Sequence, residues 1–420
     1  MSGRLELGGV PAARAFTALR ALEPDAHACY FYDLDALERR ARRFLAAFAA
    51  LAPTVVYAIK ANGLPALLER LAALGLGAEA GSLGELELAR AAGFGPERRV
   101  LNGNGRTAEE AAWAAREGVA LVNADSAGEL DLLERAAASG RAGAVRVALR
   151  VNPEIGAGGH PFIQTGNASA KFGIAPLEAL ELWAVRTRWP HLVLDGIHIH
   201  VGSQILDPAP LEEARAVALE IAAESARRGA PLALVNMGGG LGVDYSGGGA
   251  EFPLEAFAER WIAGAAGSGL EWVLEPGRWL VAPVGVLIAE VLAVKRRGSR
   301  RFVVLGAGMN DFLRPALYHA AHRIEPLERR PGPPESAVVV GPVCESSDVF
   351  AAAAELPPLE PGDLCAICDV GAYGASMASN YNGRGRLAEL VASAGRLTRA
   401  RAGESPADLL ARLTRDELRW

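Results

Sequence analysis

A lysine at the end of an apolar segment is the first residue in this chain whose type and position could do chemistry. Residues 55–59 are all apolar and lead directly into Lys60, and the breakers Asn62, Gly63 and Pro65 follow. A short apolar run bounded by breakers is typical of a strand that is buried on both faces in a parallel sheet. An amine at the carboxyl end of such a strand, partly removed from water, can attack a carbonyl and form a Schiff base. On this segment alone, the alternative is a lysine whose ammonium simply extends into solvent.

Two histidines lie one residue apart in the segment GIHIHVGSQ. His198 and His200 share one face of the expected strand, because successive side chains on a strand alternate between faces. Such a pair could ligate a metal ion, but no third ligand is evident nearby, so we expect no metal site. The remaining alternatives are buried imidazoles with satisfied nitrogens and an imidazole that stacks on a flat cofactor.

Two further turns follow apolar segments. The stretch NMGGGLG (236–242) contains three consecutive glycines, which let backbone N–H groups approach a ligand and cradle a phosphate. It lacks the helix that directly follows a dinucleotide-binding glycine motif. In EPGR (275–278), Glu275 could keep a pyridine nitrogen protonated, and Arg278 could bind a phosphate or carboxylate through two hydrogen bonds. The alternative for EPGR is a turn with a solvated ion pair.

The four cysteines differ in what they could do. Cys344 lies beside a glutamate in GPVCESSD, where a thiol could donate a proton next to a group that recognises a substrate. Cys365 and Cys368 lie three residues apart in an expected strand, so they point to opposite faces and cannot ligate one metal ion together. We interpret both as small core or surface residues rather than a redox pair, and Cys29 as a packing residue.

These residues need a scaffold, and the pattern of elements predicts one. From about residue 36 to 280, amphipathic helical segments alternate regularly with short apolar strands, which indicates βαβ units and a closed (β/α)8 barrel. After residue 280, strand-like segments follow with few helices between them (284–294, 301–308, 337–343 and 363–374). We therefore expect a barrel domain at 36–280 and a β-rich domain made of 1–35 and 281–420, with the strand around Tyr30 joining the latter.

Composition limits the class of protein. The chain has 420 residues, of which 50% are hydrophobic and 22% are charged, as expected for a globular enzyme of two domains. A net charge of −6 argues against a nucleic-acid partner. The first residues do not resemble a signal peptide, and no apolar run has membrane-spanning length. We expect a cytoplasmic protein without membrane or nucleic-acid partners.

Taken together and in this order, the motifs resemble those of the fold-type III pyridoxal 5′-phosphate (PLP)-dependent amino-acid decarboxylases. The resemblance covers nearly the whole chain from about residue 30 and is far more specific than any single motif. The stretches that carry it are YAIKAN, LNGNGRT, RVNPEIGAGGHPFIQTG, KFGI, GIHIHVGSQI, NMGGGLGVDY, EPGRWLVA, GMNDFLRPALY, GPVCESSD and GAYGASMASNYNGR. It implies an α/β barrel with a C-terminal β-domain that supplies substrate and dimer contacts, and a homodimer with shared active sites.

The resemblance also implies a role for each matching residue. Lys60 holds PLP through a Schiff base, His200 stacks on the ring with Ser203 close by, and Glu275 pairs with the pyridine nitrogen. Cys344 is the proton donor, which reaches in from the other subunit. The glycine turn and the EPGR loop hold the cofactor phosphate, and a second set of residues holds the substrate. The phosphate-binding residues are Gly238, Gly239, Gly240, Gly277 and Arg278, and the substrate-binding residues are Arg278, Arg314, Tyr318, Glu345 and Tyr373, the last of which also contacts the cofactor.

The implied reaction is the decarboxylation of meso-2,6-diaminopimelate to L-lysine and CO₂, in which the arginines take the distal carboxylate and Glu345 helps to hold the distal ammonium. Two stretches depart from the family pattern: Glu79 replaces a common aspartate, and LGAGMND replaces a more acidic run. Other members of the scaffold stay open as alternatives. They are a decarboxylase of a related amino acid in a specialised-metabolite pathway, an alanine-racemase-like enzyme and a non-catalytic PLP-binding protein.

Overall fold

A computed structural model of the chain describes residues 5–140, 143–153, 155, 171–248, 251–411 and 413. It contains two compact units. The barrel unit comprises Glu38–Asp244 and Ala250–Leu280, and the β-rich unit comprises Met1–Leu37, Tyr245–Gly249 and Val281–Trp420. Most of the motif RVNPEIGAGGHPFIQTG lies outside the described residues, which leave out 154 and 156–170.

The predicted barrel is confirmed. Eight parallel strands close in the order β10-β11-β4-β5-β6-β7-β8-β9. The strands are β4 (Thr54–Ala58), β5 (Gly77–Ala80), β6 (Arg99–Leu101), β7 (Leu121–Ala124), β8 (Val145–Arg150), β9 (Leu192–His198), β10 (Leu234–Asn236) and β11 (Glu271–Leu274). Six of these strands contribute one residue each to a buried cluster: Val56, Val100, Leu121, Ala148, Leu234 and Val273. Such a layer of branched side chains fills the barrel rather than leaving a pore.

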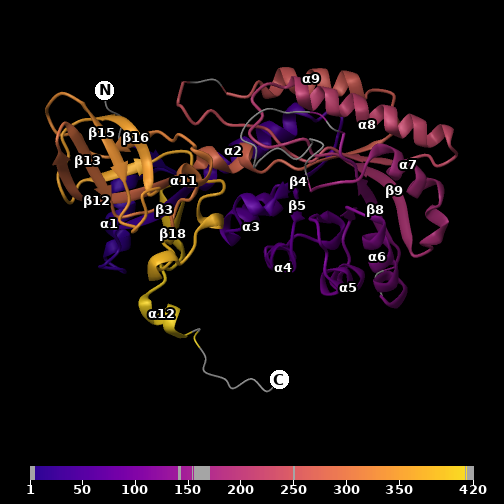
Figure 1. Ribbon diagram of the computed structural model, residues 1–420, viewed down its shortest axis with the longest axis horizontal. Helices are drawn as coiled ribbons and strands as arrows, with labels where there is room; N and C mark the ends of the chain where they lie inside the picture. The colour runs from indigo at the N-terminus through magenta and orange to yellow at the C-terminus, as the bar shows by residue number, and fades with distance from the viewer. Residues whose placement is uncertain are drawn as a thin grey trace. The chain divides into compact units, whose positions relative to one another are not determined.

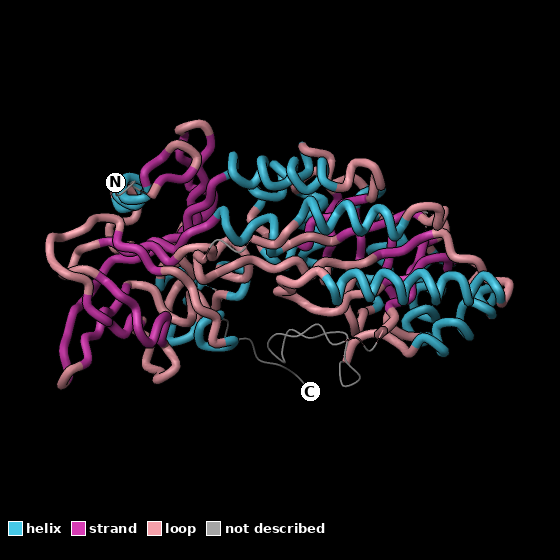
Figure 2. Tube along the Cα trace, turned by 90° about the horizontal axis from the view of Figure 1, so that it is seen from above, coloured by secondary structure: helices cyan, strands magenta, loops and turns pink. Residues whose placement is uncertain are grey.

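Helices run along the outside of these strands (Figures 1 and 2). They are α2 (Leu34–Ala47), α3 (Pro65–Ala73), α4 (Leu83–Ala91), α5 (Ala108–Glu117), α6 (Ala127–Ser139), α7 (Pro176–Ala184), α8 (Ala209–Arg227), α9 (Leu254–Ala265) and α10 (Arg278–Val281). Ser82, Thr107 and Ser126 each accept a hydrogen bond from the backbone N–H three residues later and so begin α4, α5 and α6. These caps fix where each strand–helix connection at the barrel mouth ends.

Strand β4 shows why the lysine lies where it does. Val55 to Ala58 are buried, which confirms the prediction of a strand covered on both faces. The short 3₁₀ helix η1 (Ile59–Ala61) follows at once and places Lys60 at the carboxyl end of the barrel. The side chain of Lys60 is 47% exposed, so the strand is buried while its terminal amine reaches the barrel mouth.

The β-rich unit is built from both ends of the chain. Its main sheet has the order β16-β15-β13-β12-β3-β18-β19, with β17 also pairing β12 and β14 pairing β17. The strands are β1 (Glu6–Leu7), β2 (Val10–Pro11), β3 (Ala28–Asp33), β12 (Gly285–Arg297), β13 (Arg300–Leu305), β14 (Ile324–Pro326), β15 (Glu335–Val340), β16 (Val349–Leu356), β17 (Leu364–Ile367), β18 (Ala388–Ser393) and β19 (Arg396–Arg401). The helices are α1 (Ala12–Arg20), α11 (Arg314–Tyr318) and α12 (Pro406–Ala411). The strand around Tyr30 does join this unit, because β3 pairs with β12 and β18.

Six strands of this unit were not predicted: β1, β2, β14, β16, β18 and β19. β16 has the sequence VFAAAAEL, and alanine is a helix former that gives no strand signal. β18 and β19 form an antiparallel hairpin whose turn contains Ala394 and Gly395, both with positive φ. An alanine in that conformation is unusual, so the turn carried no recognisable signature. None of the helices among the described residues is sufficiently long and apolar to span a membrane.

Candidate active site

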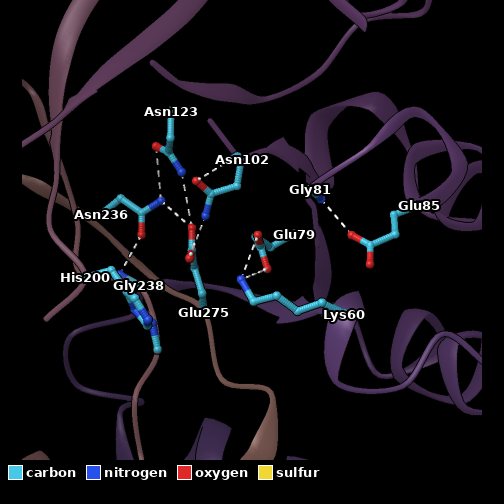
Figure 3. A network of polar contacts seen from close by, with 12 residues as sticks. Lys60, Glu79, Gly81, Glu85, Asn102, Asn123, His200, Asn236, Gly238 and Glu275 are labelled. Carbon is cyan, nitrogen blue, oxygen red and sulfur yellow. Dashed lines mark hydrogen bonds and ion pairs between the residues drawn. The ribbon is translucent and has the colours of Figure 1, made fainter. Parts of the chain in front are cut away.

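Polar side chains from six strand ends meet at the carboxyl end of the barrel (Figure 3). In a parallel barrel all eight carboxyl ends lie at one face, so side chains distant in sequence are brought together there. The residues are Lys60 after β4, Glu79 in β5, Asn102 after β6, Asn123 in β7, Asn236 at the end of β10 and Glu275 after β11. The predicted convergence of Lys60 and Glu275 on this face is therefore present within the barrel unit.

Lys60 is paired with a buried glutamate. Its Nζ lies 3.2 Å from Oε1 and 3.1 Å from Oε2 of Glu79, whose side chain is 1% exposed. Glu79 stands where an aspartate is common in the PLP-dependent decarboxylases that the sequence resembles, and its carboxylate contacts the amine of Lys60. It holds the lysine amine at the barrel mouth from beneath, while nearly half of the lysine side chain stays exposed.

Glu275 lies deeper and has a different environment. It is 4% exposed and accepts hydrogen bonds from the side-chain amides of Asn102, Asn123 and Asn236. Burial, and then the nearby charge of Glu79, raises the pKa of Glu275 to about 7. The site thus contains a carboxyl group poised between its neutral and charged forms near neutral pH.

The two histidines of GIHIHVGSQ are not equivalent. His198 is fully buried and its Nε2 lies 3.8 Å from Oε2 of Glu275, whereas His200 is partly exposed. Burial holds the pKa of both imidazoles well below the ordinary value, so both are neutral at pH 7. Among the residues that the structure describes, no three His, Cys, Asp or Glu side chains are grouped to hold a metal ion.

The glycine turn packs directly against His200. The N–H of Gly239 donates to Nδ1 of His200 at 3.2 Å, which leaves the ring proton on Nε2. A Cβ on Gly238 would lie 2.6 Å from the same Nδ1, and one on Gly239 would lie 2.3 Å from the carbonyl oxygen of Glu275. Gly238 also has φ of +60°, so glycine is required at this turn for both conformation and space.

Arg278 lies beside the same turn. Its Nη2 donates to Oγ of Ser203 at 2.9 Å, and the guanidinium is largely buried. Gly277 precedes it and packs on the end of β4, where a Cβ would lie 3.0 Å from Cβ of Ala58. The barrel unit therefore groups all of the predicted cofactor-binding residues except Tyr373, which belongs to the β-rich unit.

The β-rich unit holds the other predicted residues in two clusters of its own. In the first, Arg314 and Tyr318 are the ends of α11, and Nη1 of Arg314 lies 2.7 Å from Nε2 of His322. The guanidinium also lies over the ring of Tyr245, 4.3 Å from its centroid. His322 in turn contacts the carbonyl of Cys368 through Nδ1 at 2.8 Å. Sequence reasoning gave no role to Tyr245, although it ends the stretch NMGGGLGVDY, and it missed His322, which belongs to no motif.

The second cluster is the turn that carries Cys344 and Glu345, both of which are exposed. The N–H of Cys344 donates to Oδ1 of Asn382 at 3.1 Å, and the hydroxyl of Tyr381 donates to Glu345 at 2.5 Å. Buried Asp348 accepts hydrogen bonds from the backbone N–H of Val343, just before the turn, and from that of Met309 in the loop after β13. The thiol and carboxylate are thus presented on a supported turn.

Tyr373 and the remaining cysteines complete the placement. Tyr373 has φ of +56°, a rare conformation for a tyrosine that is often found at functional sites. Cys365 and Cys368 are buried and not in disulfides, and burial raises their pKa values to about 12 and about 11. Burial also raises the pKa of Cys29. Cys29 is buried as predicted, and of the two alternatives for Cys365 and Cys368, core or surface, the structure has the core.

The barrel fold and the grouping of the predicted site residues agree with the family resemblance of the sequence motifs. A family model described as "Pyridoxal-dependent decarboxylase, pyridoxal binding domain" matches residues 34–282, which include the whole barrel. The chain therefore belongs to the pyridoxal-dependent decarboxylases.

Its relatives within that family have a narrower name. The diaminopimelate decarboxylase of Helicobacter pylori strain J99 is 41% identical over 90% of this chain and 94% of that protein. The diaminopimelate decarboxylase of Zymomonas mobilis is 40% identical over 91% of each. Among solved structures, diaminopimelate decarboxylase from M. jannaschii in co-complex with L-lysine has a TM-score of 0.91 and 33% identity and covers 99% of this chain and 97% of that chain. The H. pylori enzyme complexed with L-lysine has a TM-score of 0.88 and 39% identity, with coverage of 93% and 98%.

The residues at the barrel mouth fit PLP. The cofactor needs an amine for its aldehyde, an acid for its ring nitrogen and donors for its phosphate. Lys60 supplies the amine, and Glu275 supplies a buried carboxyl whose hydrogen-bond partners in the site are neutral amides. The glycine turn and Arg278 supply backbone N–H groups and a guanidinium.

Proposed function

We propose that this protein decarboxylates meso-2,6-diaminopimelate to L-lysine and CO₂, with PLP bound at the barrel mouth. The observation that carries the proposal is the arrangement of Lys60, Glu275 and the glycine turn at one end of the barrel. The relatives over nearly the whole chain are diaminopimelate decarboxylases, and solved relatives hold L-lysine, the product of this reaction.

Each barrel residue has a role that follows from its environment. PLP, when bound, supplies a ring that withdraws the electrons released as the bond to the departing carboxylate breaks. Lys60 would hold the cofactor through its amine, which Glu79 keeps at the barrel mouth and which would act as a base after the substrate amine binds. Glu275 would keep a proton on the ring nitrogen, and neutral His200 would lie against the ring face. Gly238, Gly239, Gly240, Gly277 and Arg278, with Ser203 beside them, hold the phosphate.

The β-rich unit supplies the proton and reads the substrate. Cys344 delivers a proton to the carbon that has lost CO₂, and in our proposal this thiol comes from the partner chain of a homodimer. Arg278 and Arg314 bind the distal carboxylate, Glu345 helps to bind the distal ammonium, and Tyr318 and Tyr373 complete the contacts. The buried guanidinium of Arg314 is held in place by His322 and Tyr245, which suits a residue that selects one anion.

We further propose that the protein is cytoplasmic and has neither a membrane nor a nucleic-acid partner, in line with its net charge of −6. The division of labour between a PLP-binding barrel at 36–280 and a β-rich domain of 1–35 and 281–420 that makes substrate and dimer contacts belongs to the same proposal.

Product analysis tests the activity. Purified protein with PLP is incubated separately with meso-, L,L- and D,D-diaminopimelate, ornithine and lysine, and amine products and CO₂ are measured. L-Lysine from the meso isomer is expected, with kcat/KM roughly 100-fold or more above that for ornithine, because ornithine leaves a buried guanidinium without its carboxylate. Comparable values for ornithine would refute the substrate assignment, and a change of configuration without CO₂ release would indicate a racemase.

Reduction with borohydride tests the cofactor site separately. The chain has three lysines, Lys60, Lys171 and Lys295, so a reduced PLP adduct maps to one of three peptides. We expect the Lys60 peptide, and Lys60→Ala should prevent the adduct. An adduct on either other lysine would contradict the site.

A further inference from the structure

We propose that Asn102, Asn123 and Asn236 are positioning residues that hold Glu275 as an oriented, ionised carboxylate toward the ring nitrogen of bound PLP. The inference rests on the proposed function, because it assigns the partner of Glu275 to that nitrogen. It concerns three asparagines to which neither the sequence motifs nor the proposed mechanism gave a role.

The three amides reach Glu275 from three different strand ends (Figure 3). Nδ2 of Asn236 lies 2.7 Å and Nδ2 of Asn123 lies 3.3 Å from Oε1, and Nδ2 of Asn102 lies 3.2 Å from Oε2. All three asparagines are at most 6% exposed. A carboxylate that receives donors on both oxygens from three separate strands has little freedom to rotate, so its orientation is set by the barrel itself.

The orientation of each amide is also fixed, because each amide oxygen has its own donor. Oδ1 of Asn102 accepts the N–H of Gly103 at 3.1 Å, and Oδ1 of Asn236 accepts the N–H of Gly238 at 2.9 Å. Oδ1 of Asn123 accepts from Nδ2 of Asn236 at 3.4 Å. With the oxygens occupied in this way, the NH₂ groups face Glu275, and an exchanged oxygen and nitrogen would lose contacts at both ends.

Neutral donors matter here because they satisfy the carboxylate without cancelling its charge. The charge of Lys60 favours the ionised form of Glu275, but the Lys60 amine is itself paired with Glu79, and burial keeps His198 and His200 neutral. The guanidinium of Arg150 also influences Glu275, but no described hydrogen bond joins them. A carboxylate held in this way keeps its negative charge for a further cation, which a protonated pyridine nitrogen provides.

The amides also oppose the effect of burial. Burial and the charge of Glu79 favour the neutral form of Glu275 and raise its pKa to about 7, whereas the charge of Lys60 and then the hydrogen bond from Asn236 favour the charged form. Removing an amide donor should therefore return the proton to Glu275, and a neutral acid no longer stabilises a protonated ring nitrogen.

The substitution Asn236→Asp tests this directly. The new side chain keeps an oxygen for the N–H of Gly238 but replaces the NH₂ that faces Glu275 with a second acid. Two carboxyls in contact share one proton, so the introduced acid can donate to Glu275 at low pH and repels it once that proton is lost. PLP retention and the visible absorption of the holoenzyme should match wild type at about pH 6. Relative to wild type, the affinity for PLP should fall roughly 10- to 100-fold by about pH 9, the range expected for a lost hydrogen bond to a charged group.

Two further variants serve as a second test of the proposal and as its control. Asn102→Asp repeats the design at a second position, since its oxygen also holds a glycine N–H, and it should acquire the same alkaline loss of PLP. Asn380→Asp is the matched control, because Nδ2 of Asn380 donates to Glu404 at 2.7 Å in the β-rich unit. It places a second acid beside a glutamate in the other unit, and it should retain PLP like wild type at every pH.

Failure of this proposal can be distinguished from failure of the proposed function. If folded Asn236→Asp and Asn102→Asp, checked by circular dichroism, keep the wild-type pH dependence of PLP retention, the asparagines act only on the glycine turns and the proposal is wrong. The same conclusion follows if Asn380→Asp shows an equal alkaline loss. If the wild-type protein itself does not bind PLP, the proposed function fails first, whatever the variants do.

Discussion

Replacing Glu275 with glutamine should change how the stability of the PLP-free protein depends on pH. Glu275 is buried, and its pKa rises from the ordinary value of 4.5 to about 7 in the folded protein. The folded state therefore binds this proton more tightly than the unfolded state. Its stabilising contribution is fully present below about pH 4.5 and is lost as the pH rises through about 7.

The size of the effect follows from the pKa rise. A rise from 4.5 to about 7 corresponds to on the order of 3 kcal/mol of unfolding free energy, at about 1.4 kcal/mol for each pH unit. Glutamine cannot ionise, so Glu275→Gln removes this dependence. It also brings an NH₂ group toward three amide donors, which costs stability equally at all pH values. Between pH 5 and pH 9 the variant should therefore gain roughly 2–3 kcal/mol relative to wild type, whatever its starting point, because part of the effect is already lost at pH 5.

Urea unfolding followed by tryptophan fluorescence measures this difference. Six of the seven tryptophans (113, 183, 189, 261, 272 and 279) belong to the barrel unit, so the signal reports on the unit that contains Glu275. Glu224→Gln serves as the control, because Arg228 and Arg227 lower the pKa of this partly exposed carboxylate and its effect should be small and of opposite sign. A wild-type-minus-variant difference that stays constant from pH 5 to pH 9 would refute the reasoning.

Three further predictions follow from the clusters. Cys344→Ser should bind PLP normally, because the turn is held by its backbone, but should slow product formation, since a hydroxyl donates a proton less readily than a thiol; unchanged rates would exclude the thiol as proton donor. Lys60→Ala and Cys344→Ala homodimers can be dissociated and mixed, and mass spectrometry shows whether heterodimers form. In such mixtures about one quarter of the sites should regain activity if each site takes one residue from each chain. No site should regain activity if both residues come from one chain. Gly238→Ala should cost about 1–3 kcal/mol of stability in urea titrations and weaken PLP binding, because φ is +60° and the new Cβ meets His200; wild-type values would show that the turn adjusts.

The sequence was most informative where one local pattern determines the structure. The apolar run at 55–59 with breakers behind it correctly predicted a buried strand and the position of Lys60, because burial on both faces leaves a continuous apolar signature. The alternation of helices and strands correctly predicted the barrel. The alanine-rich strand β16 was missed because its side chains favour a helix, and only pairing with β15 makes it a strand.

The contacts between side chains in the site were harder to predict from the sequence, for a different reason. Motif residues such as Glu275 could be selected by chemical type, but their partners come from strands far away in sequence. Asn123 belongs to no recognised motif, and a buried asparagine has neither charge nor periodicity to distinguish it. Likewise, nothing in the spacing of Arg314 and His322 predicts that their side chains meet, because the contact depends on the chain turning back after α11.

Strand β3 has a consequence for the order in which a ribosome-bound chain can fold. It pairs with β12 on one side and β18 on the other, and the hydrogen bond from Tyr32 to Glu389 joins residues 357 positions apart. During synthesis β3 is made early, but its neighbour β12 is complete only at residue 297 and its neighbour β18 only at residue 393. Every strand of the barrel, in contrast, is complete by residue 274. The barrel can therefore fold first, and the nascent β-rich unit keeps an unpaired edge of β3 until translation is nearly finished.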